Sequence, residues 1–181
     1  MRKFTTIIVL MVIFFIIFFM QANVFNAFTI AGIKPNLVVI FILFIGLFTT
    51  QTLGIGFGVV CGLIIDLIYG KVIGTTAIML CIIGYLGSYF DKNFSKENKL
   101  TILLMVFGAT FIYELGLYFI NSIILDFDRE YFAFFKILII EIIYNILLTI
   151  ILYPIIQKSG YMLERAFKRN NILTRYFWCF A

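Results

Sequence analysis

The sequence contains no histidine, and this absence excludes several kinds of chemistry. Ser–His proteolysis, His-ligated haem, HExxH zinc sites and histidine proton relays all need an imidazole. The three cysteines, Cys61, Cys81 and Cys179, follow no metal or redox spacing, and we expect no disulfide between them. No Walker A and no CxxC motif occurs either. We therefore expect no enzyme and no resident metal or cofactor.

Charged residues are also scarce in this chain of 181 residues. Only 13% of the residues are charged, 64% are hydrophobic, and the mean hydropathy is +1.12. Soluble domains contain only about 45–50% apolar residues. This composition predicts an all-α integral membrane protein with almost no room for a soluble domain. Because the basic residues lie between apolar segments, the net charge of +5 indicates membrane topology rather than nucleic-acid binding.

Six apolar segments predict a six-helix transmembrane bundle. The expected spans are about 4–20, 36–50, 53–69, 72–90, 100–121 and 132–156, and a basic cytoplasmic tail follows at 157–181. The first apolar run is longer than the roughly 7–15 residues of a signal-peptide core, so we expect an uncleaved helix. The second and third segments are short for the roughly 20 residues that a span needs. They also fit a single helical hairpin.

The distribution of Lys and Arg predicts the orientation of the bundle. Six spans place both termini on the same side, and most of the 14 basic residues fall on that side. By the positive-inside rule both termini are cytoplasmic. The segment 161–177 mixes basic and apolar residues, and two interpretations of it remain open. It either forms an amphipathic helix on anionic lipid or is a solvated tail that only sets the topology.

The stretch "GIGFGVVCGLIID" places Gly54, Gly58, Gly62 and Asp66 at intervals of four residues, on one face of a helix. Glycine allows helix backbones to approach closely within a bilayer. This face therefore predicts a tight contact, either within the chain or with a helix of another protein. Asp66 either reaches the outer headgroups, pairs with Lys71, or is fixed among helices. In the last case it orients the bundle or holds a partner's cation.

Two further acids lie within the expected spans. Glu114 and Glu141 are both in the outer half of the bundle, and Asn145 follows Glu141 by one helical turn, where it can hydrogen-bond it. Together with Asp66, these side chains predict a polar pocket. A proton or cation pathway would use such acids too. The candidate counter-ions are Lys34, Arg129 and Lys136.

The segment from about residue 34 to residue 80 carries a recognisable set of motifs. They are Pro35, Asn36 and Leu37 at the head of the second span, then Gly56, Phe57, Gly62, Leu63 and Asp66, and finally Gly74. In these motifs, as in its size, spans and basic tail, the chain resembles the rod shape-determining protein MreD family. The resemblance makes Pro35, Asn36 and Gly74, with the glycine stripe and Asp66, candidates for partner binding or packing.

The resemblance also implies a function. Members of this family are non-enzymatic scaffold subunits of the cell-elongation complex, the elongasome, in the bacterial inner (cytoplasmic) membrane. A member is expected to bind MreC, a single-span protein, and to act indirectly with MreB, RodA and a class B penicillin-binding transpeptidase. These proteins maintain cell shape through side-wall peptidoglycan synthesis. The implied fold is similar to the substrate-binding subunits of energy-coupling-factor transporters. The alternative function is therefore a vitamin-type substrate-binding subunit of a membrane transporter.

Overall fold

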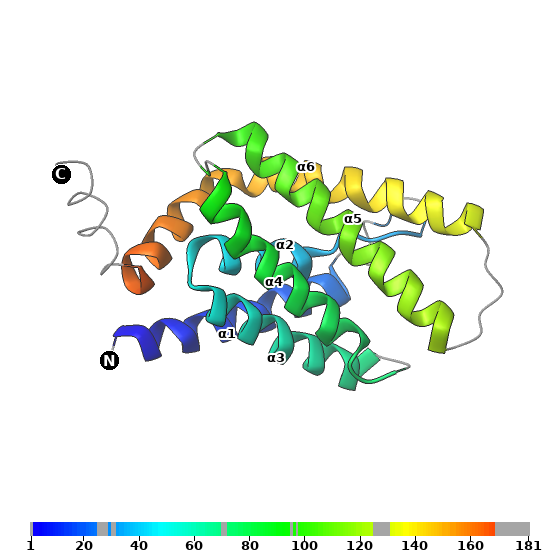
Figure 1. Cartoon of the computed structure of the whole chain (residues 1–181), viewed down its shortest axis with the longest axis horizontal. Helices are drawn as coiled ribbons and strands as arrows, with labels where there is room; N and C mark the ends of the chain where they lie inside the picture. The colour runs from blue at the N-terminus through cyan, green and yellow to red at the C-terminus, as the bar shows by residue number, and fades with distance from the viewer. Residues whose placement is uncertain are drawn as a thin grey trace.

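The computed structural model describes residues 2–24, 29, 32–69, 72–94, 96, 98–124 and 131–168. Its elements within these ranges are six α-helices (Figure 1). The helices are α1 (Arg2–Asn23), α2 (Leu37–Phe48), α3 (Gln51–Tyr69), α4 (Thr75–Asn93), α5 (Lys99–Ile124) and α6 (Tyr131–Phe167).

Four of these helices are long and apolar enough to cross a membrane. The qualifying segments are Lys3–Asn23, Gln51–Tyr69, Lys99–Ile124 and Phe134–Phe167. They support the expectation of a multi-pass transmembrane protein. The 12 residues of α2 span only about 18 Å at 1.5 Å per residue, against a hydrocarbon core of about 30 Å. A short helix of this kind does not cross the bilayer alone.

Helix α2 forms the centre of the bundle. All of its residues except Phe41 are buried, as expected for a helix that is apolar on every side. It contacts each of the other helices, and Figure 1 shows it enclosed among them. Both of its ends therefore lie among other helices. Free backbone N–H and C=O groups at those ends need polar partners supplied by neighbouring helices.

Helix α6 is longer than the expected sixth span. It continues through Pro154 to Phe167, so the first part of the segment expected as a tail is helical. Packing explains the extension, because the ring of Tyr161 lies edge-on against the ring of Phe48 at the end of α2, with centroids 5.9 Å apart. Residues 169–181, which include most of the basic tail, lie outside the described residues.

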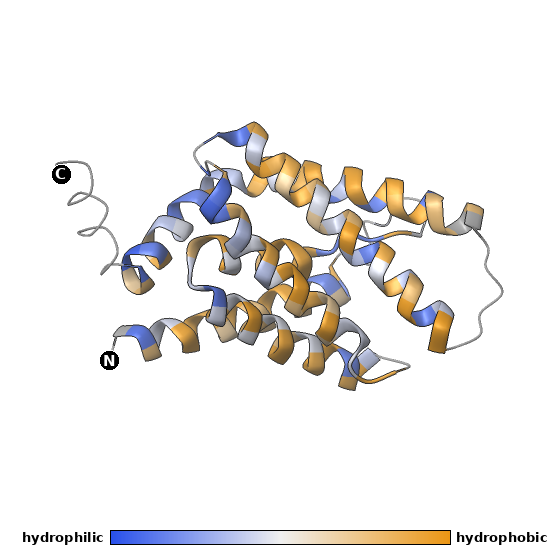
Figure 2. Cartoon of the chain, in the orientation of Figure 1, coloured by the Kyte–Doolittle hydropathy of each residue, from blue (hydrophilic) through white to orange (hydrophobic). Residues whose placement is uncertain are grey.

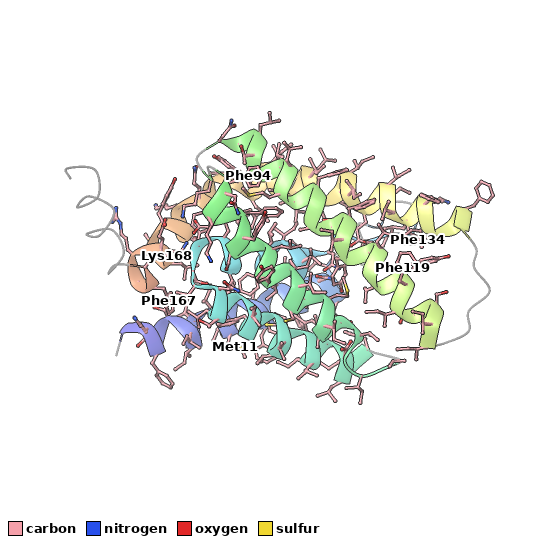
Figure 3. All side chains as sticks on the ribbon, in the orientation of Figure 1. Met11, Phe94, Phe119, Phe134, Phe167 and Lys168 are labelled. Carbon is pink, nitrogen blue, oxygen red and sulfur yellow. The ribbon has the colours of Figure 1, made fainter. Side chains whose placement is uncertain are left out.

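Hydrophilic residues gather at one end of the bundle, where α1 begins and α6 ends (Figure 2). Lys168 lies at this end, whereas Phe119 and Phe134 lie towards the opposite end (Figure 3). Between the two ends, α5 and α6 carry isolated hydrophilic positions within otherwise apolar helices (Figure 2). Glu114 lies in α5 and Glu141 in α6, whereas Asp66 lies in α3.

Candidate functional site

Three of the four glycines of α3, the glycine face (Gly54, Gly58 and Gly62), lie directly against α4. A Cβ atom at Gly58 would overlap the backbone carbonyl of Leu80, and one at Gly62 would overlap the Cα atom of Ala77. Backbones that approach this closely leave no room for any side chain. The structure therefore uses the glycine face for packing between two helices of the same chain.

The same close approach continues from α4 onto α2, through glycines that the sequence analysis did not single out. A Cβ atom at Gly46 would lie 3.1 Å from the Cα atom of Gly87. The hydroxyl of Ser88 also donates a hydrogen bond of 2.9 Å to the carbonyl of Gly46. The signal for this contact is the repeat of Gly84 and Gly87 in the fourth apolar segment, but it does not reveal the partner helix.

Asp66 is buried beneath the start of α4, with 1% of its surface exposed. Its carboxylate accepts hydrogen bonds from the backbone N–H groups of Gly74 at 2.8 Å, Thr76 at 3.1 Å and Ala77 at 3.2 Å. Gly74 has a positive φ of 103°, which favours glycine and turns the chain back towards Asp66. The carboxylate thus satisfies the free N–H groups of the helix N-terminus. Lys71, its expected partner, lies outside the described residues.

Asn36 connects the start of α2 to α5 and α6. Its side chain accepts a hydrogen bond from the N–H of Val39 at 3.3 Å, and its own N–H donates to Oδ1 of Asn145 at 2.8 Å. Asn145 is fully buried and donates from Nδ2 to the hydroxyl of Thr110 at 3.1 Å. Asn145 therefore bonds to Asn36 and Thr110, instead of the expected Glu141. Pro35, next to the cap, is buried.

Glu114 of α5 and Glu141 of α6, the carboxyl pair, meet at the interface of the two helices. Their side chains lie within hydrogen-bonding reach of each other, and the side chain of Asn36 lies within reach of Glu141. Glu141 is 6% exposed and Glu114 is half-buried. Of the three acids expected to line a polar pocket, Glu114 and Glu141 come together, while the carboxylate of Asp66 is engaged by the start of α4.

The expected counter-ions do not contact the carboxyl pair in the described structure. Lys34 and Lys136 are exposed, and neither forms an ion pair with a described residue. Arg129 lies outside the described residues. The carboxyl pair therefore has no cationic partner among the residues that the structure describes.

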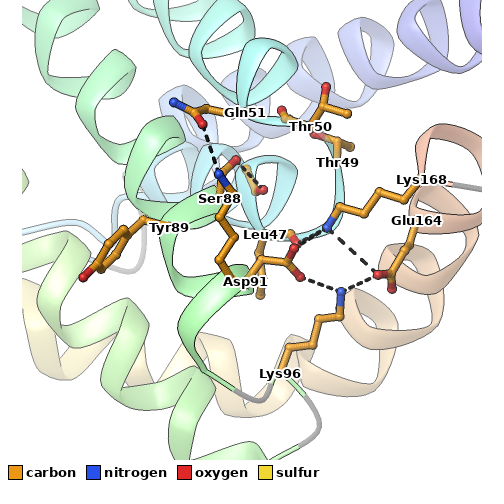
Figure 4. A network of polar contacts seen from close by, with 12 residues as sticks. Leu47, Thr49, Thr50, Gln51, Ser88, Tyr89, Asp91, Lys96, Glu164 and Lys168 are labelled. Carbon is orange, nitrogen blue, oxygen red and sulfur yellow. Dashed lines mark hydrogen bonds and ion pairs between the residues drawn. The ribbon is translucent and has the colours of Figure 1, made fainter. Parts of the chain in front are cut away.

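A second polar group, which the sequence analysis missed, joins the end of α4, the residues that follow it and the end of α6 (Figure 4). We call Asp91, Lys96, Glu164 and Lys168 the ion cluster. Lys96 Nζ lies 2.8 Å from Asp91 and 2.6 Å from Glu164, and Lys168 Nζ lies 2.6 Å from Asp91. Lys168 also donates to the carbonyl of Leu47 at 3.1 Å, which satisfies the C-terminal end of α2.

The ion cluster changes the proton affinity of its members. Burial alone raises the pKa of Asp91, but hydrogen bonds from Lys168 and Lys96 outweigh it and bring that pKa below its ordinary value. Burial lowers the pKa of Lys96, but its hydrogen bonds to Asp91 and Glu164 outweigh this effect and raise it. At Lys168 burial dominates, and the pKa is lowered. Asp91 is therefore held ionised at neutral pH.

A family model described as rod shape-determining protein MreD matches residues 1–161 of the 181-residue chain. The match includes α1 to α5 and most of α6. No curated protein and no solved structure matches the chain. Because the family model covers far more than half of the sequence, the resemblance seen in residues 34–80 is confirmed. The chain belongs to the rod shape-determining protein MreD family.

Proposed function

We propose that the chain is a non-enzymatic membrane subunit of the bacterial cell-elongation complex, and that it binds MreC. The observation that carries the proposal is the family match over residues 1–161, since the family acts in rod shape determination. In this proposal the chain supports side-wall peptidoglycan synthesis together with MreB, RodA and a class B penicillin-binding transpeptidase. It acts as a scaffold and contacts these three indirectly.

The use of polar side chains within the bundle supports a scaffold. Asp66 caps the start of α4, Asn36 and Asn145 hold the start of α2, and Lys168 holds its end. Each of these groups satisfies backbone atoms where a helix begins or ends. Such groups rigidify a bundle but are not free to act on a substrate. Polar side chains that hold helix ends in place are typical of a protein whose role is to position its partners.

The proposed location is the cytoplasmic membrane, with both termini in the cytoplasm. The start of α1 and the end of α6 lie at the same end of the bundle (Figure 1). Lys168 lies there too (Figure 3), and Lys96 joins it in the ion cluster through Asp91 (Figure 4). Cytoplasmic ends of membrane proteins carry an excess of Lys and Arg, so we assign this end to the cytoplasm.

The packing of α3 constrains where MreC docks in this proposal. Because Gly58 and Gly62 contact α4, a partner helix has no access to the glycine face. Docking therefore uses helix faces outside this contact. The family match gives no support to the alternative function, a vitamin-type substrate-binding subunit similar to those of energy-coupling-factor transporters, and we do not pursue it.

Native mass spectrometry of the full chain, mildly extracted from its own membranes, tests the proposal. We expect a stable complex with a single-span protein that carries a large external domain. As a control, tagged chain added after extraction should not acquire the partner if the complex forms in the membrane. A stoichiometric small molecule, or an energy-coupling subunit with ATPases in place of the single-span protein, contradicts the proposal.

A further inference from the structure

The carboxyl pair is the polar group of the bundle whose charge the described residues do not balance. Asp66 accepts three backbone N–H groups, and Asp91 accepts hydrogen bonds from two lysines. Glu141, in contrast, is 6% exposed, and its Oε1 atom has no hydrogen-bond partner among the described residues. The described groups that interact with it include the Glu114 carboxyl, the neutral amide of Asn36 and Tyr113. None of these three groups carries a positive charge that would neutralise a carboxylate.

Two carboxyl groups in contact need a positive charge or a proton between them. A hydrogen bond from one carboxyl to the other exists only when one of them is protonated. Two carboxyl groups in contact in a low-dielectric site are not both ionised, because charge repulsion and the loss of solvation oppose the second ionisation. Because Glu141 is buried with an unpartnered oxygen, we expect the contact between Glu114 and Glu141 to hold one proton.

Within the described part of the chain, the groups that face the carboxyl pair from the neighbouring helices supply no positive charge. From α2 comes the Asn36 amide, and Asp66 of α3 is an acid within electrostatic reach of Tyr113 on α5. Helix α4 meets α5 there through the apolar side chain of Met79. Helical spacing places Tyr118 of α5 and Tyr144 of α6 beside the pair. Of the remaining candidates, Lys34 and Lys136 are exposed, and Arg129 lies outside the described residues.

A row of hydroxyl groups leads from the pair towards the end of the bundle opposite the ion cluster. Tyr118 and Ser122 follow Glu114 on α5 at intervals of four residues, on the same helix face. Both hydroxyls are buried and have no hydrogen-bond partner among the described residues. The ring of Tyr118 packs on that of Phe134 with centroids 4.2 Å apart, which places it between α5 and α6. Buried hydroxyls in this position hydrogen-bond readily to water.

We propose that Glu114 and Glu141 form an intramembrane proton-binding site, which holds one exchangeable proton between the two carboxyl groups and is reached along Tyr118 and Ser122. Binding takes a proton from a hydronium ion and leaves water, and release reverses this, so nothing is oxidised or reduced. The ligand is a hydrogen ion. The site is independent of the proposed complex with MreC, because it needs only groups of this chain.

Infrared spectroscopy of the full chain in lipid nanodiscs at neutral pH tests the site. We expect a C=O stretching band of a protonated carboxyl that shifts when H2O is replaced by D2O. The band should shift in Glu114→Gln and in Glu141→Gln, and be lost in the double variant. Gln has the size of a protonated Glu and can hydrogen-bond, so the fold should survive. Glu164→Gln is the matched control, and it should leave the band unchanged.

The access route is tested in chains that keep both Glu114 and Glu141. The rate of the D2O shift should fall several-fold in Tyr118→Phe and in Ser122→Ala. Tyr89→Phe, an exposed tyrosine on α4, should exchange at the wild-type rate. A wild-type chain without a protonated-carboxyl band, or a band that survives in the double variant, overturns the proposal. Carboxylate bands that respond to added Na+ at constant pH would instead indicate a metal-cation site and would also overturn it.

Discussion

At the scale of single residues, polar side chains in this protein act mainly on backbone groups. Asp66 accepts hydrogen bonds from three backbone N–H groups at the N-terminus of α4, and Asn145 accepts one from the N–H of Asn36, which precedes α2. In the apolar interior these N–H groups have no water to bond with, so each side chain replaces solvent. The loss of folding free energy when such a side chain is removed depends on how many backbone N–H groups lose their hydrogen-bond acceptor.

We expect Asp66→Ala to destabilise the fold strongly. The change leaves the buried N–H groups of Gly74, Thr76 and Ala77 without their acceptor, at about 1–3 kcal/mol for each unsatisfied group. Asp66→Asn keeps one acceptor oxygen and should lose less. Thermal unfolding in detergent, with Leu67→Ala as a lipid-facing control at 70% exposure, measures the difference. Equal melting temperatures for Asp66→Ala and Leu67→Ala would show that the cap does not stabilise the fold.

The hydrogen bond between Asn145 and Thr110 should appear as a coupling energy between the two residues. Single hydrogen bonds in membrane proteins contribute about 0.6 kcal/mol on average. We therefore expect Thr110→Val to cost about that much in the wild type and almost nothing in an Asn145→Ala background. A double-mutant cycle of unfolding free energies measures this coupling. Strictly additive effects would mean that the contact contributes nothing.

At the scale of helices, close backbone contact explains how a 12-residue helix is held at the centre of a membrane bundle. Glycines of α3 and α4 bring the two backbones together, and Gly46 of α2 meets Gly87 of α4. Dispersion and backbone contact hold these helices because lipid offers no hydrophobic drive for association. This contact requires glycine at the positions where the two backbones touch, whereas other positions of the same helix accept a side chain.

Substitutions of different glycines in α3 should therefore have very different effects on the stability of the fold. Gly58→Ala places a methyl group on the Leu80 carbonyl and should destabilise the protein by several kcal/mol, since overpacking costs about 1–3 kcal/mol or more. Gly56→Ala is the matched control on the same helix, because nothing lies within 4 Å of its added Cβ atom. Its higher helix propensity should leave stability unchanged or increase it by up to about 1 kcal/mol.

Unfolding in detergent, followed by helix content, separates the two glycine substitutions. The expected result is a lowered midpoint for Gly58→Ala and a midpoint at or above wild type for Gly56→Ala. If both variants unfold at the wild-type midpoint, the close contact between α3 and α4 does not exist.

For the whole molecule, the sequence predicts the helices but not which of them meet. Apolar runs locate all six helices, and the four-residue spacing of Gly54, Gly58 and Gly62 predicts a close contact. The partner of that contact, α4, depends on tertiary packing that no local pattern contains. The same limit applies to Asn145, which lies 109 residues from its partner Asn36. The helical extension of α6 to Phe167 also depends on a distant contact, that of Tyr161 with Phe48.

The ion cluster joins distant parts of the chain, and its pH dependence should be visible in the stability of the whole molecule. The pKa of Asp91 is lowered in the folded state, so its contribution is present above the unfolded value of about 3.9 and is lost as the pH falls through the folded pKa. At alkaline pH the raised pKa of Lys96 and the lowered pKa of Lys168 act in opposite directions. The acid limb, the part of the stability curve below neutral pH, therefore reports the contribution of Asp91 separately from those of the two lysines.

We expect Asp91→Asn to lower stability at neutral pH by about 1 kcal/mol, a modest value because the side chains of the cluster remain partly exposed. The variant should also lose less stability than the wild type between pH 5 and pH 3, since it has no carboxyl to protonate. Melting temperatures across this pH range measure both effects. Lys92→Gln, on the exposed neighbouring residue, should follow the wild-type curve within about 0.5 kcal/mol. Parallel acid limbs for wild type and Asp91→Asn would mean that Asp91 does not bind Lys96 and Lys168 in the folded protein.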